Sequence, residues 1–399
     1  MKKKLLILAV AGFALASCSS DETVNSLANS EANEINFRPL MTGVTRTAYS
    51  NGPISSFDTG DAFNVYASYK NAKYFQANFQ KQAGSTFTST PIYYWPGDLG
   101  TDYTFSEYNT AFGTTYADQS AFESAVGGSD RIKKMTFTAI FSATQKVDNP
   151  GIIEDFSPAS SAGSQVDVLV AKTEVTSDAG TSGVPLTFYH ALSQVIVKVK
   201  NTNADLNLAI TDVMLGQVTT NGTFTYTGNG SAKVARTDWG AATSPARGSY
   251  TQSQAVNFTG TNDGSSDNAV VTLGSPWLIV PQVAVNTQEY NTANSTLPSI
   301  DGSTNPDIVG NFLALKMSIT NHGNTISTTR WCCWPINQTF DPGYIYTFVI
   351  DAGSGGYQPV DTDNNKSGLD KVLPNAIVFS ATCSIDPWVA SGSDIPVNN

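Results

Sequence analysis

The stretch that decides the fold is Val184-Pro-Leu-Thr-Phe-Tyr-His-Ala-Leu-Ser-Gln-Val-Ile-Val-Lys-Val-Lys200. Apolar side chains take every second position, first at Leu186 and Phe188 and then, with the opposite parity, from Val195 to Val199. Such alternation predicts extended chain with one buried face. The change of parity at 192–194 requires an extra residue or a bend, which lets a strand cross from one sheet of a sandwich to the other. We therefore expect a core strand of an antiparallel β-sandwich, near a domain junction.

The amino terminus carries an export signal. Met1-Lys-Lys-Lys4 precedes the apolar run Leu5–Ala16, which is too short to span a membrane as a permanent helix. The run ends in Leu15-Ala-Ser-Cys18, the pattern of a bacterial lipobox, so residues 1–17 are predicted to be removed and Cys18 to receive a lipid. The alternative, an ordinary secretory signal with an incidental cysteine, would also export the protein. Residues 18–33 are then expected to be a flexible leader.

Composition excludes some partners. The chain has 22 Lys+Arg and 33 Asp+Glu, a net charge of −11, which becomes −14 when Lys2, Lys3 and Lys4 leave with the signal. An acidic balance argues against nucleic acid and against anionic membrane surfaces as partners. The chain has 399 residues, of which 40% are hydrophobic and 14% charged, and Thr, Ser, Asn and Gly are abundant. These features are typical of a turn-rich extracellular β protein with two domains.

The sequence offers no catalytic motif. His190 and His322 are its only histidines, and it has no nucleophile elbow, phosphate loop, dinucleotide fingerprint or His-Glu-x-x-His helix. Residues 361–368 have the early Asp/Asn spacing of a calcium loop, but Lys366 stands where glycine is needed and Val372 where a glutamate is needed. We therefore expect no enzyme activity, no cofactor and no metal site.

Three cysteines, Cys332, Cys333 and Cys383, follow Cys18 in the chain. Adjacent residues on a strand face opposite sides, so at most one of Cys332 and Cys333 could form a disulfide with Cys383. The alternative is that they are small buried hydrophobes beside Trp331 and Trp334.

Several short motifs, in the same order along the chain, resemble the fimbrillin family, the type V pilins of oral and gut anaerobes. The resemblance implies an all-β chain of two transthyretin-like antiparallel β-sandwich domains in tandem, with short helices in loops. We expect these domains at 34–183 and 184–399. The motifs are Asp167-Val-Leu-Val-Ala171, the 186–199 pattern Leu-x-Phe-x-His-Ala-Leu-x-x-Val-x-Val-x-Val, Trp277-Leu-Ile-Val-Pro-Gln282, the strand Pro342–Ile350 and Ile385-Asp-Pro-Trp388.

The resemblance also implies proteolytic maturation. Fimbrillins carry a Thr-Arg motif near their first strand, here Thr45-Arg46 within an expected strand at about 34–48, and an arginine-specific protease cuts after the arginine. The alternative is an exposed strand arginine that is never cut. By the same resemblance, the C-terminal segment 375–389 would fill the groove that the first strand vacates in the next subunit, because an unpaired strand edge accepts another chain.

The expected function is that of a structural subunit of a cell-surface fimbria, exported as an outer-membrane lipoprotein and polymerised with other fimbrial subunits for adhesion. A rival within the family is an anchor or tip subunit that keeps the lipid on Cys18. A rival of a different class is a surface glycan-binding lipoprotein, in which Trp95 or Trp277 would stack on sugars. The sequence does not identify the adhesive target.

Four local predictions can be compared with the structure. Residues 118–126 are expected to form a short helix, and residues 312–319 and 325–334 a β-hairpin. By resemblance, residues 102–105 should be a strand. Residues 244–267 are polar and are expected to be a surface excursion.

Overall fold

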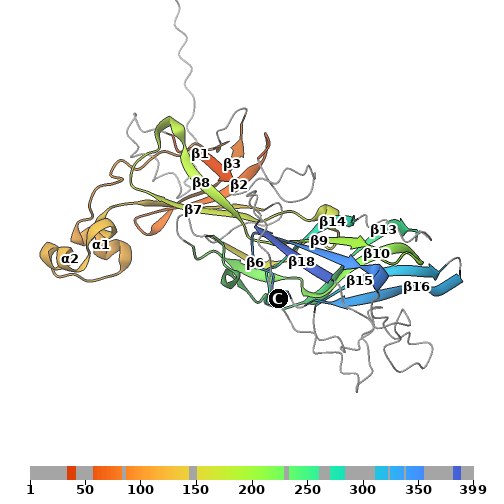
Figure 1. Cartoon of the computed structure of the whole chain (residues 1–399). Coiled ribbons are helices and arrows are strands. Elements are labelled where there is room, and N and C mark those ends of the chain that lie inside the picture. Colours follow the sequence, from red (N-terminus) through yellow and green to blue (C-terminus); the bar gives the residue numbers. More distant parts are fainter. Residues whose placement is uncertain are drawn as a thin grey trace, which may run out of the picture.

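The computed structural model describes residues 34–41, 57–82, 87–142, 151–228, 233–259, 270–283, 311–321, 324–336, 338–354 and 381–387. These residues form β-strands with two short α-helices, which confirms the expected all-β class. Figure 1 shows two β modules side by side, one built mainly from the first half of the chain and the other from the second. That each module is transthyretin-like in detail stays a prediction.

The first module is a closed barrel. Its alternating strands direct every second side chain inward, as in the buried-and-intermediate alternation of Ala62–Tyr69, and the core is rich in phenylalanine. Around the ring the order is β1-β4-β3-β2-β5-β7-β8, and all neighbours are antiparallel except β1 and β8. The strands are β1 (Phe37–Met41), β2 (Ala62–Tyr69), β3 (Ala72–Lys81), β4 (Phe87–Thr88), β5 (Met135–Phe141), β7 (Leu169–Val175) and β8 (Val184–His190).

A helical excursion, residues 102–131, leaves the barrel between β4 and β5. It contains helices α1 (Phe105–Phe112) and α2 (Gln119–Ala125), which stand away from the barrel in Figure 1. Asp118 caps α2, so the helix predicted at 118–126 is confirmed. The strand predicted at 102–105 is wrong, because Thr104 and Glu107 form a capping box that starts α1 at this point.

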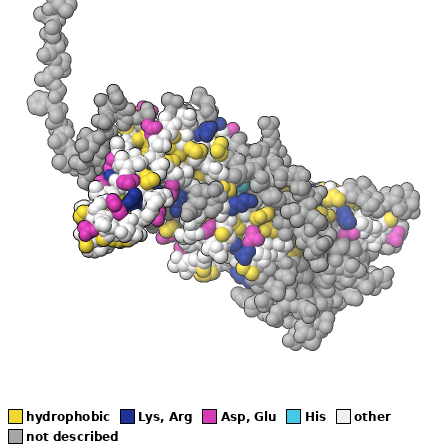
Figure 2. All heavy atoms as spheres, turned by 60° about the vertical axis from the view of Figure 1, so that its left-hand side comes forward, with side chains coloured by type: hydrophobic (Ala, Val, Ile, Leu, Met, Phe, Trp, Pro, Cys, Tyr) yellow, Lys and Arg dark blue, Asp and Glu magenta, His cyan; other side chains and the backbone are white. Residues whose placement is uncertain are grey.

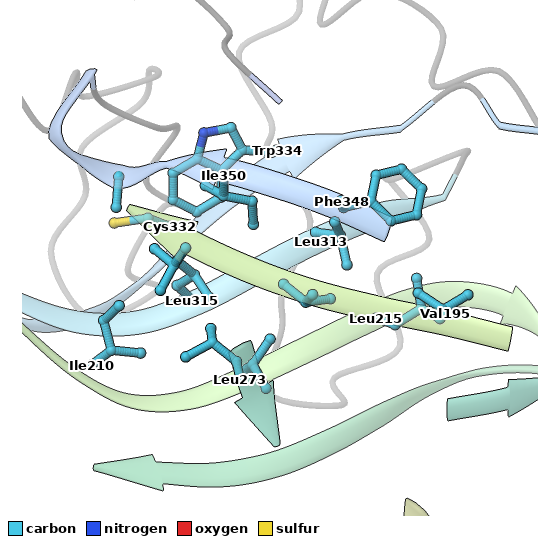
Figure 3. Close-up of a cluster of buried hydrophobic side chains, with 14 of the residues drawn as sticks. Val195, Ile210, Leu215, Leu273, Leu313, Leu315, Cys332, Trp334, Phe348 and Ile350 are labelled. Atoms are coloured by element: carbon cyan, nitrogen blue, oxygen red, sulfur yellow. The ribbon is translucent and has the colours of Figure 1, made fainter. Parts of the chain in front are cut away.

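The second module is a sandwich of two four-stranded sheets. One sheet has the order β13-β10-β15-β16 and the other β14-β9-β17-β18. Apolar side chains from both sheets meet between them (Figure 3), among them Leu315, Trp334 and Phe348. The strands are β9 (Ser193–Lys200), β10 (Leu206–Thr219), β13 (Arg247–Phe258), β14 (Val271–Ile279), β15 (Phe312–Asn321), β16 (Asn324–Pro335), β17 (Tyr344–Asp351) and β18 (Ala381–Pro387).

Two local predictions can be judged in this module. Strands β15 and β16 pair antiparallel, which confirms the predicted hairpin. The prediction of a surface excursion at 244–267 is wrong for its first half, because β13 is a twelve-residue strand paired with β10.

A small third sheet joins the modules. Its order is β12-β11-β6, in which the central strand β11 (Gly222–Thr225) pairs with β12 (Trp239–Gly240) on one side and with β6 (Ile152–Phe156), from the first half of the chain, on the other. An apolar cluster between the modules includes Phe156, Phe224 and Trp239. The two modules are therefore packed against each other rather than linked by a flexible segment.

The chain passes from β8 in the barrel to β9 in the sandwich through Ala191 and Leu192 alone. The parity change at this point is therefore a crossing between sheets, as predicted, but between sheets of different modules. Because β8 pairs with β1 and β7, the expected boundary between residues 183 and 184 is wrong, and the sheets divide at residues 191–192.

Candidate functional site

The barrel is closed by its first strand. Strand β1 pairs with β8 over five positions, from Phe37↔Val184 to Met41↔Phe188. On its other side β1 has a single register pair with β4, Phe37↔Phe87. The described part of the sequence-predicted first strand thus lies in a sheet. Removal of β1 would leave β4 and β8 with unpaired edges, and unpaired edges accept another strand.

Two side chains of this segment fill the barrel core. Ile35 and Phe37 are buried, while Arg38 is exposed and Leu40 is 44% exposed on the outer side. The ring centroid of Phe37 lies 4.6 Å from that of Phe79 and 5.1 Å from that of Phe137, and both contacts are edge-to-face. The segment therefore presents an Ile-x-Phe pattern to two deep positions of the core.

Backbone hydrogen bonds extend the pairing to the residues before β1. The amide of Ile35 donates to the carbonyl of Tyr93 at 2.8 Å, and the amide of Val184 donates to the carbonyl of Asn36 at 2.9 Å. Gly183 has a φ of +72°, and a Cβ there would lie 2.7 Å from Asn36 Oδ1. Glycine is therefore needed at position 183 for β1 to approach this closely.

One atom of the segment fits its position poorly. The side-chain oxygen of Asn36, Oδ1, is buried and has no hydrogen-bond partner among the residues that the structure describes. A buried acceptor without a donor destabilises a folded state by about 1–3 kcal/mol. The groove that holds β1 would therefore favour an apolar residue at the position of Asn36.

The sandwich has two kinds of edge. At one edge, Gln252 on β13 binds the backbone of Ser275 on β14 twice, as acceptor at 2.9 Å and as donor at 2.7 Å. Gln254 accepts a hydrogen bond from the amide of Gly274 at 3.0 Å. These side chains bridge the two sheets. At the other edge, β18 pairs only with β17 among the strands that the structure describes.

Strand β18 is the whole described part of the predicted donor segment. It covers residues 381–387 of 375–389 and lies antiparallel to β17, from Tyr344↔Pro387 to Ile350↔Ala381. The predicted donor is thus an edge strand of its own sandwich. An edge strand can leave a sheet without separating any other strand pair.

The other sequence-predicted site residues have different outcomes. Cys18 and Arg46 lie outside the described residues, as do His322 and the calcium-like segment 361–368. The indoles of Trp95 and Trp277 are 5% and 1% exposed. Neither presents a ring face to solvent, so the expectation that they stack on sugars is wrong for this conformation. Trp95 lies in the core of the barrel and Trp277 in the core of the sandwich.

Cysteine and metal predictions concern mainly the sandwich. Cys332 is buried in the sandwich core, in register with Leu315, as the hydrophobe interpretation expected. The side chains of Cys333 and Cys383 are outside the described set. Within the described ranges no group of three His, Cys, Asp or Glu side chains is placed to hold a metal ion. On the face in Figure 2, acidic and basic side chains are interspersed over the coloured surface.

The helices that the structure describes are all too short or too polar to cross a membrane.

An ionic cluster that the sequence did not reveal fastens the helical excursion to the barrel. Lys133 is buried, and its Nζ lies 3.1 Å from Glu107 Oε1 and 3.3 Å from Asp98 Oδ2. Lys70 Nζ lies 2.7 Å from Asp98 Oδ2, and the hydroxyl of Tyr69 donates to Asp98 Oδ1 at 2.6 Å. These residues come from the end of β2 and the turn after it, the loop after β4, helix α1 and the residues just before β5.

The cluster holds both carboxylates in their charged form. A hydrogen bond from the backbone of Thr104, together with Lys133, lowers the pKa of Glu107 to about 2. Partial burial raises the pKa of Asp98, but hydrogen bonds from Lys70 and Tyr69 outweigh burial and lower it to about 2.

A second buried pair lies near the crossing between the modules. His190 Nδ1 is 2.6 Å from Asp167 Oδ2, and the amide of Val168 donates to Asp167 Oδ1 at 2.8 Å. The two residues are 23 positions apart, so no local spacing could have predicted the pair. The pair joins the end of β8 to the residues before β7 and so holds these two neighbouring strands of the barrel together.

Comparisons with known proteins identify one family and several structural neighbours. A family model described as fimbrillin-like matches residues 45–388. A candidate cell adhesion protein from Bacteroides uniformis is 14% identical with a TM-score of 0.43, over 91% of this chain and all of its own. A fimbrial assembly protein from Parabacteroides distasonis is 9% identical with a TM-score of 0.33, over 84% of this chain and 99% of its own. No curated protein matches the sequence.

Proposed function

Because the chain belongs to the fimbrillin-like family, it is a structural protein of the cell surface rather than an enzyme, and we propose that it is a fimbrial subunit that polymerises by exchanging its first strand. The observation that carries this proposal is the closure of the barrel. A single strand, β1, completes the ring, and it is held by five register pairs on one side and one on the other.

In this proposal the subunit is exported with a lipid on Cys18, which tethers it to the outer membrane until processing. A cut after Arg46 would separate β1 from the rest of the barrel, because β1 ends at Met41. The barrel would then expose the positions of Ile35 and Phe37. Burial of one such side chain is worth about 1.5–3 kcal/mol, so the open barrel favours a replacement strand.

The C-terminal donor offers a matching pattern. Ile35-Asn36-Phe37 and Ile377-Val378-Phe379 share the Ile-x-Phe spacing, and Val378 would stand where Asn36 leaves an oxygen without a partner. We therefore expect Ile377 and Phe379 of one subunit to occupy the positions of Ile35 and Phe37 in the next. The exchange would replace a side chain whose buried oxygen lacks a donor with an aliphatic one, which favours the polymer.

Digestion of the purified precursor tests the proposal. An arginine-specific protease should release the segment that ends at Arg46 and produce a ladder of non-covalent polymers on native gels, with a new amino terminus at Thr47. The matched control is Arg46→Lys, which removes the cleavage site and keeps the charge. Complete loss of β1 without any polymer would contradict strand exchange.

Two further variants test the donor register. Phe379→Ala should abolish the ladder, because the donor could not fill the deepest position, whereas Phe37→Ala should leave polymerisation intact, because β1 is absent from the polymer. Equal polymer yields from Phe379→Ala and the wild type would show that another part of the chain is the donor.

Mass spectrometry of surface material distinguishes a stalk subunit from an anchor. A mature amino terminus at Thr47 is expected for a stalk subunit, whereas a lipid retained on Cys18 would indicate an anchor.

A further inference from the structure

Among the residues that the structure describes, two pairs of strands run parallel, and the chain passes directly from β8 of one pair to β9 of the other. Strand β1 runs parallel to β8, from Phe37↔Val184 to Met41↔Phe188. Strand β9 runs parallel to β17, over the seven positions from Ile345↔Gln194 to Asp351↔Lys200. All other strand pairs in the described ranges are antiparallel.

The residues between β8 and β9 are fixed by hydrogen bonds from both modules. The amide of Ala191 donates to the carbonyl of Val168 in the barrel half, and the Nε1 of Trp239 donates to the carbonyl of Ala191 at 2.7 Å. The amide of Gly343, one residue before β17, donates to the carbonyl of Leu192 at 2.8 Å. Strands β8 and β9 therefore form one anchored path through the molecule.

We propose that this path, from the β1 position through β8 and β9 to β17, transmits tension along the fimbria, with both parallel strand pairs loaded in shear. The inference rests on the proposed strand exchange and adds a mechanical role to it. A donor strand that runs in the same direction as β1 is attached to its own subunit at its amino-terminal end. Tension therefore pulls it by that end, away from the sandwich. Strand β8 is held at its carboxyl-terminal end, through β9.

The same geometry applies in the sandwich. Strand β9 is held by its amino-terminal end at Leu192, and the chain leaves β17 at Asp351 toward the donor segment. The two strands are parallel, so tension pulls them in opposite directions along their length. Evenly spaced hydrogen bonds of a parallel pair then share the load and must break together. If tension pulled both strands from the same end, the bonds would break one at a time at a lower force.

Single-molecule pulling on the full-length precursor tests this inference without polymerisation. In the first geometry, attachment points before residue 34 and after residue 354 load β1 against β8 and β9 against β17 from opposite ends. In the second, attachment points at Ala204 and after residue 354 pull the adjacent ends of β9 and β17 apart. Non-cysteine attachment chemistry avoids Cys332, Cys333 and Cys383.

The first geometry should give a rupture force several-fold higher than the second, since the protein and the β9–β17 pair are the same and only the direction of loading differs. Equal rupture forces, or a lower force in the first geometry, would overturn the inference. Each labelled protein is compared only if its circular dichroism spectrum and its thermal unfolding match those of the unlabelled precursor.

These outcomes are separable from failure of the proposed function. If the force depends on direction but the digested protein forms no polymer, the shear geometry stands and strand exchange fails. If the polymer forms but the two geometries rupture at one force, strand exchange stands and the tension path fails.

Discussion

The barrel and the sandwich differ in how they protect their strand edges. The barrel has no edge while β1 is present, and it acquires two when β1 leaves. The sandwich keeps its edges permanently, but Gln252 and Gln254 bridge one pair of edge strands through their amides. Edge strands invite uncontrolled pairing unless they are covered or blocked.

This difference shows where assembly can be controlled. In the barrel, protection depends on β1, so under the proposed processing a cut after Arg46 would set the time at which the edges are exposed. In the sandwich, protection by β13 and β14 depends on side chains within the folded module, so it persists after processing. The comparison gives three predictions about the isolated precursor.

The largest effect is expected at the strand that closes the barrel. Phe37→Ala should lower the free energy of unfolding of the barrel by about 3–5 kcal/mol, because Phe37 is fully buried among aromatic rings. Guanidinium unfolding should show this loss. The matched control is Leu40→Ala on the same strand, which should change stability by about 0.5 kcal/mol or less, because Leu40 is on the outer side. Similar losses for both variants would mean that β1 does not close the core.

A smaller effect is expected at the bridged edge of the sandwich. Gln252→Ala removes two hydrogen bonds to Ser275 and should destabilise the sandwich by about 1–3 kcal/mol. It should also expose the β14 edge and increase oligomers in size-exclusion chromatography. Thr251→Ala, an exposed neighbour on β13, is the control and should change neither measurement. A monomeric Gln252→Ala protein of normal stability would show that the bridge does not protect this edge.

The smallest effect is expected at the helical excursion and depends on pH. The pKa values of Asp98 and Glu107 are about 2 in the folded protein, against ordinary values of 3.8 and 4.5. Because the folded pKa values are lowered, their stabilising contribution is complete above pH 4.5 and is lost as the pH falls toward 2. Amide exchange in α1 should therefore accelerate over this range while the barrel strands stay protected.

The variant Asp98→Asn should raise exchange in α1 at neutral pH and reduce its pH dependence. An α1 helix whose protection is the same at pH 2 and pH 5 would contradict a role for the cluster.

Most of the fold prediction rested on apolar side chains at every second position. The stretch 184–200 predicted one strand that crosses between sheets, because a change of parity is a local property of the sequence; the structure divides it into β8 and β9 at the crossing. The partners of these strands are set by contacts between distant residues, so the sequence did not show that β8 belongs to the barrel. Helix α1 was missed because none of its residues is buried, and only Thr104 and Glu107 marked its start.

The sequence predicted the strands that carry family motifs, but not the features of the site that depend on burial and packing. Strand β13 was missed because an edge strand with few buried side chains lacks clear apolar alternation. Trp95 and Trp277 were assigned to binding because aromatic side chains suit both a core and a sugar, and only burial distinguishes the two uses. The poor fit of Asn36 depends on three-dimensional packing and has no sequence signal.

Strand β6 belongs to the first half of the chain, but its partner β11, which in turn pairs with β12, follows the last strand of the barrel. During secretion the first half of the chain emerges before β11 and β12. The residues of β6 therefore cannot pair until residues 222–240 have followed. A truncated chain that stops at residue 190 would keep every barrel strand and still leave Phe156 uncovered. Expression of the isolated barrel should thus yield an aggregation-prone fragment, because it lacks residues 222–240 that pack against Phe156.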